Sequence, residues 1–165
     1  MLGCSQSPRD VTTANFLKRK LVKNVVELQK SDQELRVSYK PTAFRRWVVD
    51  CNSCNGETAN GIETWYYKTG SKQSKMFAQE VQSCLISETK GFLVKEKDGT
   101  SHAPKDRGVR SDTLYYTLRH TTMPSLVIEC GFMSHDGEVQ LMMTQEYQNA
   151  LARGIARGIL NTFAL

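Results

Sequence analysis

The stretch Leu126-Val127-Ile128-Glu129-Cys130 is the most apolar segment of the chain, and it decides the fold class. A continuous apolar run of this length is typical of a strand covered on both faces, as in a parallel sheet. Short apolar or alternating runs that predict strands occur on both sides of it, and they alternate with runs of helical periodicity. This alternation predicts an α/β domain, with a mainly parallel sheet flanked by helices.

The other predicted elements follow from the spacing of apolar residues along the chain. Strands are expected at 25–28, 47–51, 62–67 and 114–118. Helices are expected at 11–23, 35–44, 71–88, 136–143 and, with apolar residues at steps of four, from Tyr147 to Phe163. Residues 91–110 are rich in turn formers and basic residues, which predicts a long surface loop. The small polar residues 1–9 are expected to be disordered, so residues 10–165 are expected to form one domain.

Composition narrows the class of protein. A chain of 165 residues with 39% hydrophobic and 24% charged residues can bury a core and is not expected to be disordered. No apolar run approaches the roughly 18–20 residues of a membrane span, and no signal peptide is visible. The formal net charge is +5, and the sequence contains no long run of like charge. We therefore expect no membrane span and no nucleic-acid partner.

Cysteine and histidine spacings do not identify a metal site. The five cysteines show no framework spacing, and the pair Cys51 and Cys54 has no second ligand pair at zinc-site spacing. The three histidines, at 102, 120 and 135, are not spaced as metal ligands. Motif spacing alone therefore gives no mechanism.

Glu129 is the most informative single residue. Sites in open α/β sheets gather at the carboxyl ends of strands, and Glu129 lies near that end of the most apolar strand. A carboxylate in an apolar surround can act as a general base or acid. A strand-end glutamate paired with Arg or Lys is the equally supported alternative from position alone.

Several separate segments resemble one family in the family's own order. They are NGIETWYY at 60–67, DRGVR at 106–110, LRHTTMP at 118–124 and LVIECGFMS at 126–134. These segments, with the closing helix, resemble the zinc-dependent N-acetylmuramoyl-L-alanine amidases of bacterial autolysins and phage endolysins. The resemblance covers about two thirds of the chain.

The resemblance implies an activity and roles for several residues. The family's enzymes cleave the amide between N-acetylmuramic acid and the L-alanine of the peptidoglycan stem peptide. The resemblance gives Glu129 the role of the glutamate that takes a proton from a zinc-bound water and helps the amine leave. It also implies that Asn52, Arg107 and Arg119 bind substrate, and that peptidoglycan is the partner.

The first third of the chain departs from the family pattern. The family binds zinc through a histidine in a GHGG loop, a glutamate before the first helix and a histidine in an SIHxN strand. Here no GHGG is present, Asp10 lies beside the position of the glutamate, and Asp50 replaces the second histidine. Zinc is expected from the family, with Asp10 and Asp50 as candidate ligands, although oxygen donors favour harder ions. The first strand of the family fold is expected to be missing, which would leave an open edge beside 25–28.

Three functional hypotheses follow from these observations. The first is a working amidase whose zinc ligands are rearranged, for instance to Asp50 and His120. The second is a truncated, catalytically inactive relative that at most binds peptidoglycan. The third is an interaction module without a glycan role, based on the basic segment from Lys95 to Arg110.

Overall fold

The computed structural model describes residues 59–121 and 123–163 in full, and the backbone of residues 46–52. The predicted disordered segment, the two predicted helices and the predicted strand before residue 46 lie outside the described residues. The same holds for Asp10 and for the open edge expected beside residues 25–28.

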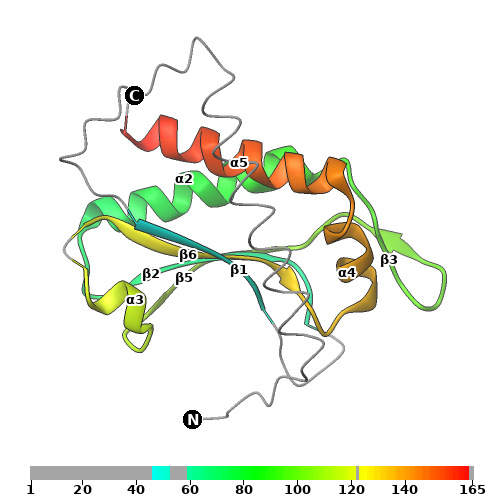
Figure 1. The fold of residues 1–165 in the computed structure, drawn as a ribbon, viewed down its shortest axis with the longest axis horizontal. Helices are drawn as coiled ribbons and strands as arrows, with labels where there is room; N and C mark the ends of the chain where they lie inside the picture. The colour runs from blue at the N-terminus through cyan, green and yellow to red at the C-terminus, as the bar shows by residue number, and fades with distance from the viewer. Residues whose placement is uncertain (1–45, 53–58, 122, 164–165) are drawn as a thin grey trace.

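Strands and helices alternate along the described chain, as predicted (Figure 1). The elements are β1 (Arg46–Asn52), β2 (Ile62–Tyr67), α2 (Lys72–Thr89), β3 (Val94–Lys95), β4 (Ser101–His102), β5 (Asp106–Asp112), α3 (Tyr116–Arg119), β6 (Ser125–Phe132), α4 (Asp136–Met142) and α5 (Gln145–Phe163).

Four of these strands form the central sheet, in the order β1-β6-β2-β5. The pairs β1–β6 and β2–β5 are parallel, whereas β2 and β6 are antiparallel. The prediction of a mainly parallel sheet is therefore confirmed, with one antiparallel junction at its centre. The strand order places the apolar strand β6 between β1 and β2.

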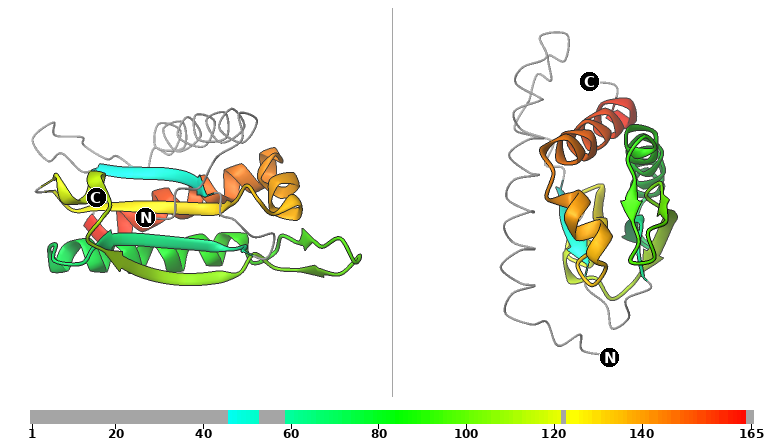
Figure 2. Two further views of the ribbon diagram at one scale, coloured as in Figure 1. Left: turned by 90° about the horizontal axis from the view of Figure 1, so that it is seen from below. Right: turned by 90° about the vertical axis from the view of Figure 1, so that its right-hand side faces the viewer.

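Helices α2 and α5 lie side by side across one face of this sheet (Figures 1 and 2). Their contact is close because small residues on α5 meet the backbone of α2. A methyl group added at Gly158 would lie 2.6 Å from the Cα of Val81, and one added at Gly154 would lie 2.8 Å from the Cα of Leu85. The two glycines therefore set the distance between the helices.

All eight residues of β6 are buried, as its continuous apolar run predicted. Side chains alternate between the faces of a strand. Leu126, Ile128 and Cys130 join the hydrophobic cluster with residues of α2 and α5. Val127 and Glu129 therefore project from the opposite face. The fold thus places the candidate glutamate on the side of the sheet away from these two helices.

Two predictions for the second half of the chain are wrong. Residues 91–110 are not one long loop, because they contain the β3–β4 hairpin and most of β5. The strand expected at 114–118 is instead the short helix α3. The sequence of β5, DRGVRSD, has few β-forming residues, and the strand is held by its long-range pairing with β2. The basic segment that motivated an interaction module is thus largely part of the fold.

Among the described residues, no helix is long and apolar enough to cross a bilayer.

Candidate active site

Glu129 stands at the centre of a group of polar and aromatic residues on the face opposite α2 and α5. Its Cα is in register with Glu63 on β2 and with Asp50 on β1. Three neighbouring strands thus each carry an acidic residue at the same level of the sheet. Paired positions lie about 4.5–5.5 Å apart between Cα atoms, so this row spans roughly 10 Å.

Glu129 is buried, with 4% of its surface exposed, and its carboxylate contacts a tyrosine hydroxyl. The hydroxyl of Tyr115 donates to Oε1 of Glu129 over 3.4 Å. Burial, and then the negative charge of Glu129, raise the pKa of Tyr115 well above its usual value. Tyr115 therefore stays protonated and serves as a donor. Its ring packs against Trp65, with centroids 5.5 Å apart.

Glu63 accepts hydrogen bonds from Arg107 and Trp65 and forms an ion pair with Arg110. Its Oε2 accepts from Nε of Arg107 at 2.8 Å and forms an ion pair with Nε of Arg110 at 3.0 Å. Its Oε1 accepts from the indole N–H of Trp65 at 2.9 Å. Glu63 is thus a glutamate near the start of a strand that has two arginine partners.

An irregularity in β5 brings both arginines to the same face. Ile62 pairs with Asp106, but Glu63 pairs with Gly108, so Arg107 is the extra residue of a bulge. Gly108 has φ +78°, a backbone conformation that residues other than glycine rarely adopt. Without the bulge, Arg107 and Arg110 would project to opposite faces, since they are three residues apart.

The structure brings together only some of the site residues expected from the sequence. Arg107 lies beside Glu63, and the backbone of Asp50 lies beside that of Glu129. Asn52 ends β1, where its Cα pairs with Phe132. Arg119 ends α3 as an exposed residue, and no contact in the described structure joins it to Glu129. The expected roles of all these residues remain proposals.

Glu138 joins the two strands that carry the site. Its carboxylate accepts from the backbone N–H of Gly61 at 2.7 Å and of Phe132 at 2.8 Å. Gly61 directly precedes β2, and Phe132 ends β6. Burial raises the pKa of Glu138 to about 7, although the two backbone hydrogen bonds lower it. Glu138 thus holds these two strand ends at fixed positions.

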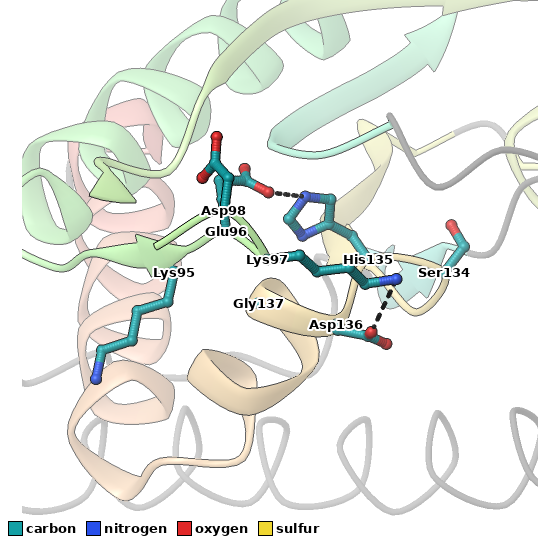
Figure 3. Close-up of a pocket in the computed structure, with 8 residues that line it drawn as sticks. All are labelled: Lys95, Glu96, Lys97, Asp98, Ser134, His135, Asp136 and Gly137. Carbon is teal, nitrogen blue, oxygen red and sulfur yellow. Dashed lines mark ion pairs between the residues drawn. The ribbon is translucent and has the colours of Figure 1, made fainter. Parts of the chain in front are cut away.

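A pocket of about 370 Å³ lies between the β3–β4 hairpin and the start of α4 (Figure 3). At this pocket, Nε2 of His135 lies 3.2 Å from Glu96. Glu96 also pairs with His102, at 2.6 Å. Backbone and carboxylate acceptors on its two ring nitrogens raise the pKa of His102. The pocket is bordered by the segment that follows β6, and Glu129 is not among its lining residues.

The described residues do not fit a zinc site. In the described ranges, no three His, Cys, Asp or Glu side chains are arranged to hold a metal ion. All three histidines of the chain lie in these ranges: two contact Glu96, and His120 bonds the carbonyl of Tyr116 and stacks on its ring. His120 was the replacement ligand suggested by the sequence. The position beside Glu129 on β1 carries Asp50, an oxygen donor, rather than an imidazole.

Several residues of this group have no role that sequence reasoning predicts. Glu63, Trp65 and Arg110 lie in the segments that carry the family resemblance, but nothing in their spacing showed that they meet. Tyr115 was assigned to a strand that is not formed. Glu63 and Trp65, two residues apart in 62–67, and the charged residues of 106–112 are the signal that could have indicated a shared polar face.

Comparison with known proteins identifies the family. A family model described as N-acetylmuramoyl-L-alanine amidase matches residues 11–161. An N-acetylmuramoyl-L-alanine amidase from Clostridium difficile 630 has a similar structure, with a TM-score of 0.73, 27% identity, and coverage of 90% of this chain and 82% of that one. The chain therefore belongs to the N-acetylmuramoyl-L-alanine amidase family.

Two curated relatives give the same family at the level of sequence. An uncharacterized cell wall amidase of Bacillus anthracis is 30% identical over 115 residues, which are 70% of this chain and 20% of that protein. The amidase LytC of Bacillus subtilis is 24% identical over 116 residues, which are 70% of this chain and 21% of LytC. This chain thus matches about a fifth of the length of either relative.

Proposed function

We propose that this chain is a peptidoglycan hydrolase that cleaves the amide between N-acetylmuramic acid and L-alanine. The observation that carries the proposal is the position of Glu129. It lies in a segment that resembles the family's glutamate motif, on the polar face of the sheet, within residues 11–161 that the family model matches. The similarity to amidases in sequence and in structure supports the substrate class.

In the proposed reaction, water adds to the lactyl carbonyl and the C–N bond breaks. Glu129 accepts a proton from the attacking water and delivers it to the alanine nitrogen, which leaves as an amine. The Tyr115 hydroxyl, 3.4 Å from Oε1 of Glu129, orients this carboxylate. Arg107, Asn52 and Arg119 remain the proposed substrate-binding residues. The family is zinc-dependent, but the described residues offer no metal site, so we assign no step to zinc.

The test is digestion of purified peptidoglycan by the full chain and by the Glu129→Gln variant. Amidase activity would release stem peptides with a new N-terminal L-alanine, and Glu129→Gln would abolish this release. Because the change preserves shape and removes only the titrating group, a matching circular dichroism spectrum would show that the variant is folded. Release that continues unchanged in Glu129→Gln would reject the role of Glu129.

A second function, binding of peptidoglycan without hydrolysis, is favoured by one observation. By resemblance, Asp50 stands where the family has a histidine, and the described residues hold no metal-binding group. The same digestion separates the two functions: a binding protein would sediment with insoluble peptidoglycan but release no new amino termini. Metal analysis of the purified full chain adds an independent readout. One zinc per chain would show that donors beyond the described side chains complete a site, which would favour hydrolysis.

A further inference from the structure

The two arginines on Glu63 have unused hydrogen-bonding capacity beside Glu129. Each guanidinium contacts Glu63 through Nε. In the described part of the chain, no hydrogen bond or ion pair engages their terminal amino groups. Arg107 has 29% of its side chain exposed and Arg110 has 45%, so solvent reaches both, whereas Glu63 is 4% exposed. Two positive charges therefore face one buried negative charge.

Aromatic rings and the buried carboxylate fix the direction of both guanidiniums. The guanidinium carbon of Arg107 lies 4.7 Å from the centroid of the Phe132 ring, and that of Arg110 lies 5.8 Å from the Trp65 ring. The carboxylate holds Nε, and the ring supports one face of each group. A guanidinium held in this way presents its remaining N–H groups as a fixed fork, which matches the geometry of a carboxylate.

The spacing of the strands places this arginine pair at a defined distance from the reacting amide. Neighbouring strands lie about 4.8 Å apart, so β5, two strands from β6, lies about 10 Å from Glu129. An extended peptide advances about 3.5 Å per residue. The guanidiniums lie nearer to Glu129 than their own strand does, because they bind Glu63 on β2, directly opposite Glu129. The second residue of a peptide whose first amide lies at Glu129 is about 7 Å further along, within reach of these guanidiniums.

We infer that Arg107 and Arg110, held by Glu63, form a subsite for the free α-carboxylate of the second residue of the stem peptide. This inference rests on the proposed function and specifies the substrate further. In peptidoglycan this residue is a D-glutamate linked through its γ-carboxyl, so that its α-carboxyl is either free or amidated. The subsite selects the free acid, because a neutral carboxamide cannot form the charge-assisted pair.

The test is a calorimetric titration of the full-length Glu129→Gln variant, which keeps the ligands intact. The probes are N-acetylmuramoyl-L-alanyl-D-glutamic acid γ-methylamide and its α-carboxamide, which differ only at the α-carboxyl. The acid should bind about tenfold or more tightly than the amide, as expected for a charge-assisted hydrogen bond. Adding Arg110→Gln should remove this preference, whereas adding Arg110→Lys should keep only part of it.

A second pair of arginines on the chain provides the matched control. Arg153 and Arg157 on α5 both form ion pairs with Glu88 on α2. These helices lie on the side of the sheet away from Glu129. Arg153→Gln makes the same change of charge at the same kind of cluster, and it should leave the acid preference unchanged. Equal affinity of the acid and the amide would overturn the inference. So would no measurable binding of either probe, or equal weakening of both probes by Arg110→Gln.

These outcomes are distinct from failure of the proposed hydrolysis. An acid preference that depends on Arg110, in a wild-type chain that releases no stem peptide, would reject hydrolysis and retain the subsite. Cleavage of acid and amide substrates at equal rates, with equal binding, would retain hydrolysis and reject the subsite.

Discussion

Glu63 and Glu129 stand directly opposite each other on the antiparallel strands β2 and β6. Like charges in this relationship destabilise a sheet unless other groups compensate them. Here Glu63 is held by two guanidiniums and an indole N–H, and Glu129 accepts a hydrogen bond from the hydroxyl of Tyr115. We expect the Glu63 carboxylate to serve as a structural anchor, and Glu129 is the candidate for proton transfer.

Glu63→Gln should destabilise the protein by about 2 kcal/mol, because hydrogen bonds to a charged group are lost and two guanidiniums lose their anion. Chemical denaturation of the variant and the wild type measures this change. The emission of Trp65 should also shift, since its indole N–H bonds Glu63. Glu88→Gln, at the other two-arginine cluster, tests whether burial matters: Glu88 is more exposed than Glu63, so its loss should cost less. Equal losses would contradict this interpretation.

Tyr115→Phe should lower kcat about tenfold and move the acid limb of the pH–rate profile to higher pH. Loss of the donated hydrogen bond makes the carboxylate form of Glu129 less favourable, so Glu129 holds its proton to higher pH. The ring contact with Trp65 is retained, which limits the effect on folding. Tyr116→Phe is the control, because Tyr116 is 69% exposed on α3. An unshifted profile in Tyr115→Phe would argue against contact with the reacting carboxylate.

Stability should decrease between pH 5 and pH 8 in a way that depends on Glu138. Its folded pKa of about 7 lies above the usual 4.5, so the folded state binds more protons than the unfolded state between these values. The contribution is fully present below about pH 4.5 and is lost as the pH rises through 7; it amounts to about 3 kcal/mol.

Glu138→Gln should be less stable than the wild type at pH 5 and should show a flatter pH dependence from pH 5 to 8. Its amide nitrogen cannot accept the second backbone N–H, which explains the lower stability. Urea denaturation at several pH values gives both quantities. Comparison of the two proteins separates Glu138 from His102, whose raised pKa produces a change of the same sign. An identical slope in both proteins would show that Glu138 does not titrate in this range.

Gly158→Ala should destabilise the fold by about 1–3 kcal/mol, because the added methyl group would lie 2.6 Å from the Cα of Val81. The change opposes the gain in helix propensity that alanine normally provides. Gly91→Ala is the control, since a methyl group there meets no atom within 4 Å, and its effect should stay within about 0.5 kcal/mol. Thermal unfolding compares the two. A Gly158→Ala variant as stable as Gly91→Ala would mean that α2 and α5 do not pack this closely.

Local periodicity was enough to predict the elements that hold the core. Burial can be predicted directly from three local patterns: the apolar run around Ile128, the spacing of Phe77 and Leu85 along α2, and the four-residue steps of α5. Strand β5 and the helix α3 were missed because their structure depends on partners distant in sequence. Arg107 and Arg110 lie in a strand because β5 pairs with β2. Tyr115 precedes α3, and its ring packs against Trp65.

The sequence singled out Glu129 as a candidate because it lies near the carboxyl end of the most apolar strand and in a segment that resembles the family's glutamate motif. Its role stays a prediction. The pairing of Glu63 with two arginines required a bulge at Arg107 and the register between β2 and β5, neither of which local composition encodes. Arg119 ends α3 as an exposed residue, and its expected role in binding substrate stays a prediction.

The central claim is tested most directly by cleavage of a defined muramoyl peptide in water enriched in ¹⁸O. Hydrolysis of the lactyl amide would place one ¹⁸O atom in the lactyl carboxylate of the sugar product and leave the released L-alanyl peptide with a free amine. Mass spectrometry should detect both products with the wild-type chain and neither with Glu129→Gln. Intact substrate after incubation with the folded wild-type chain, or label incorporated equally by Glu129→Gln, would contradict the account.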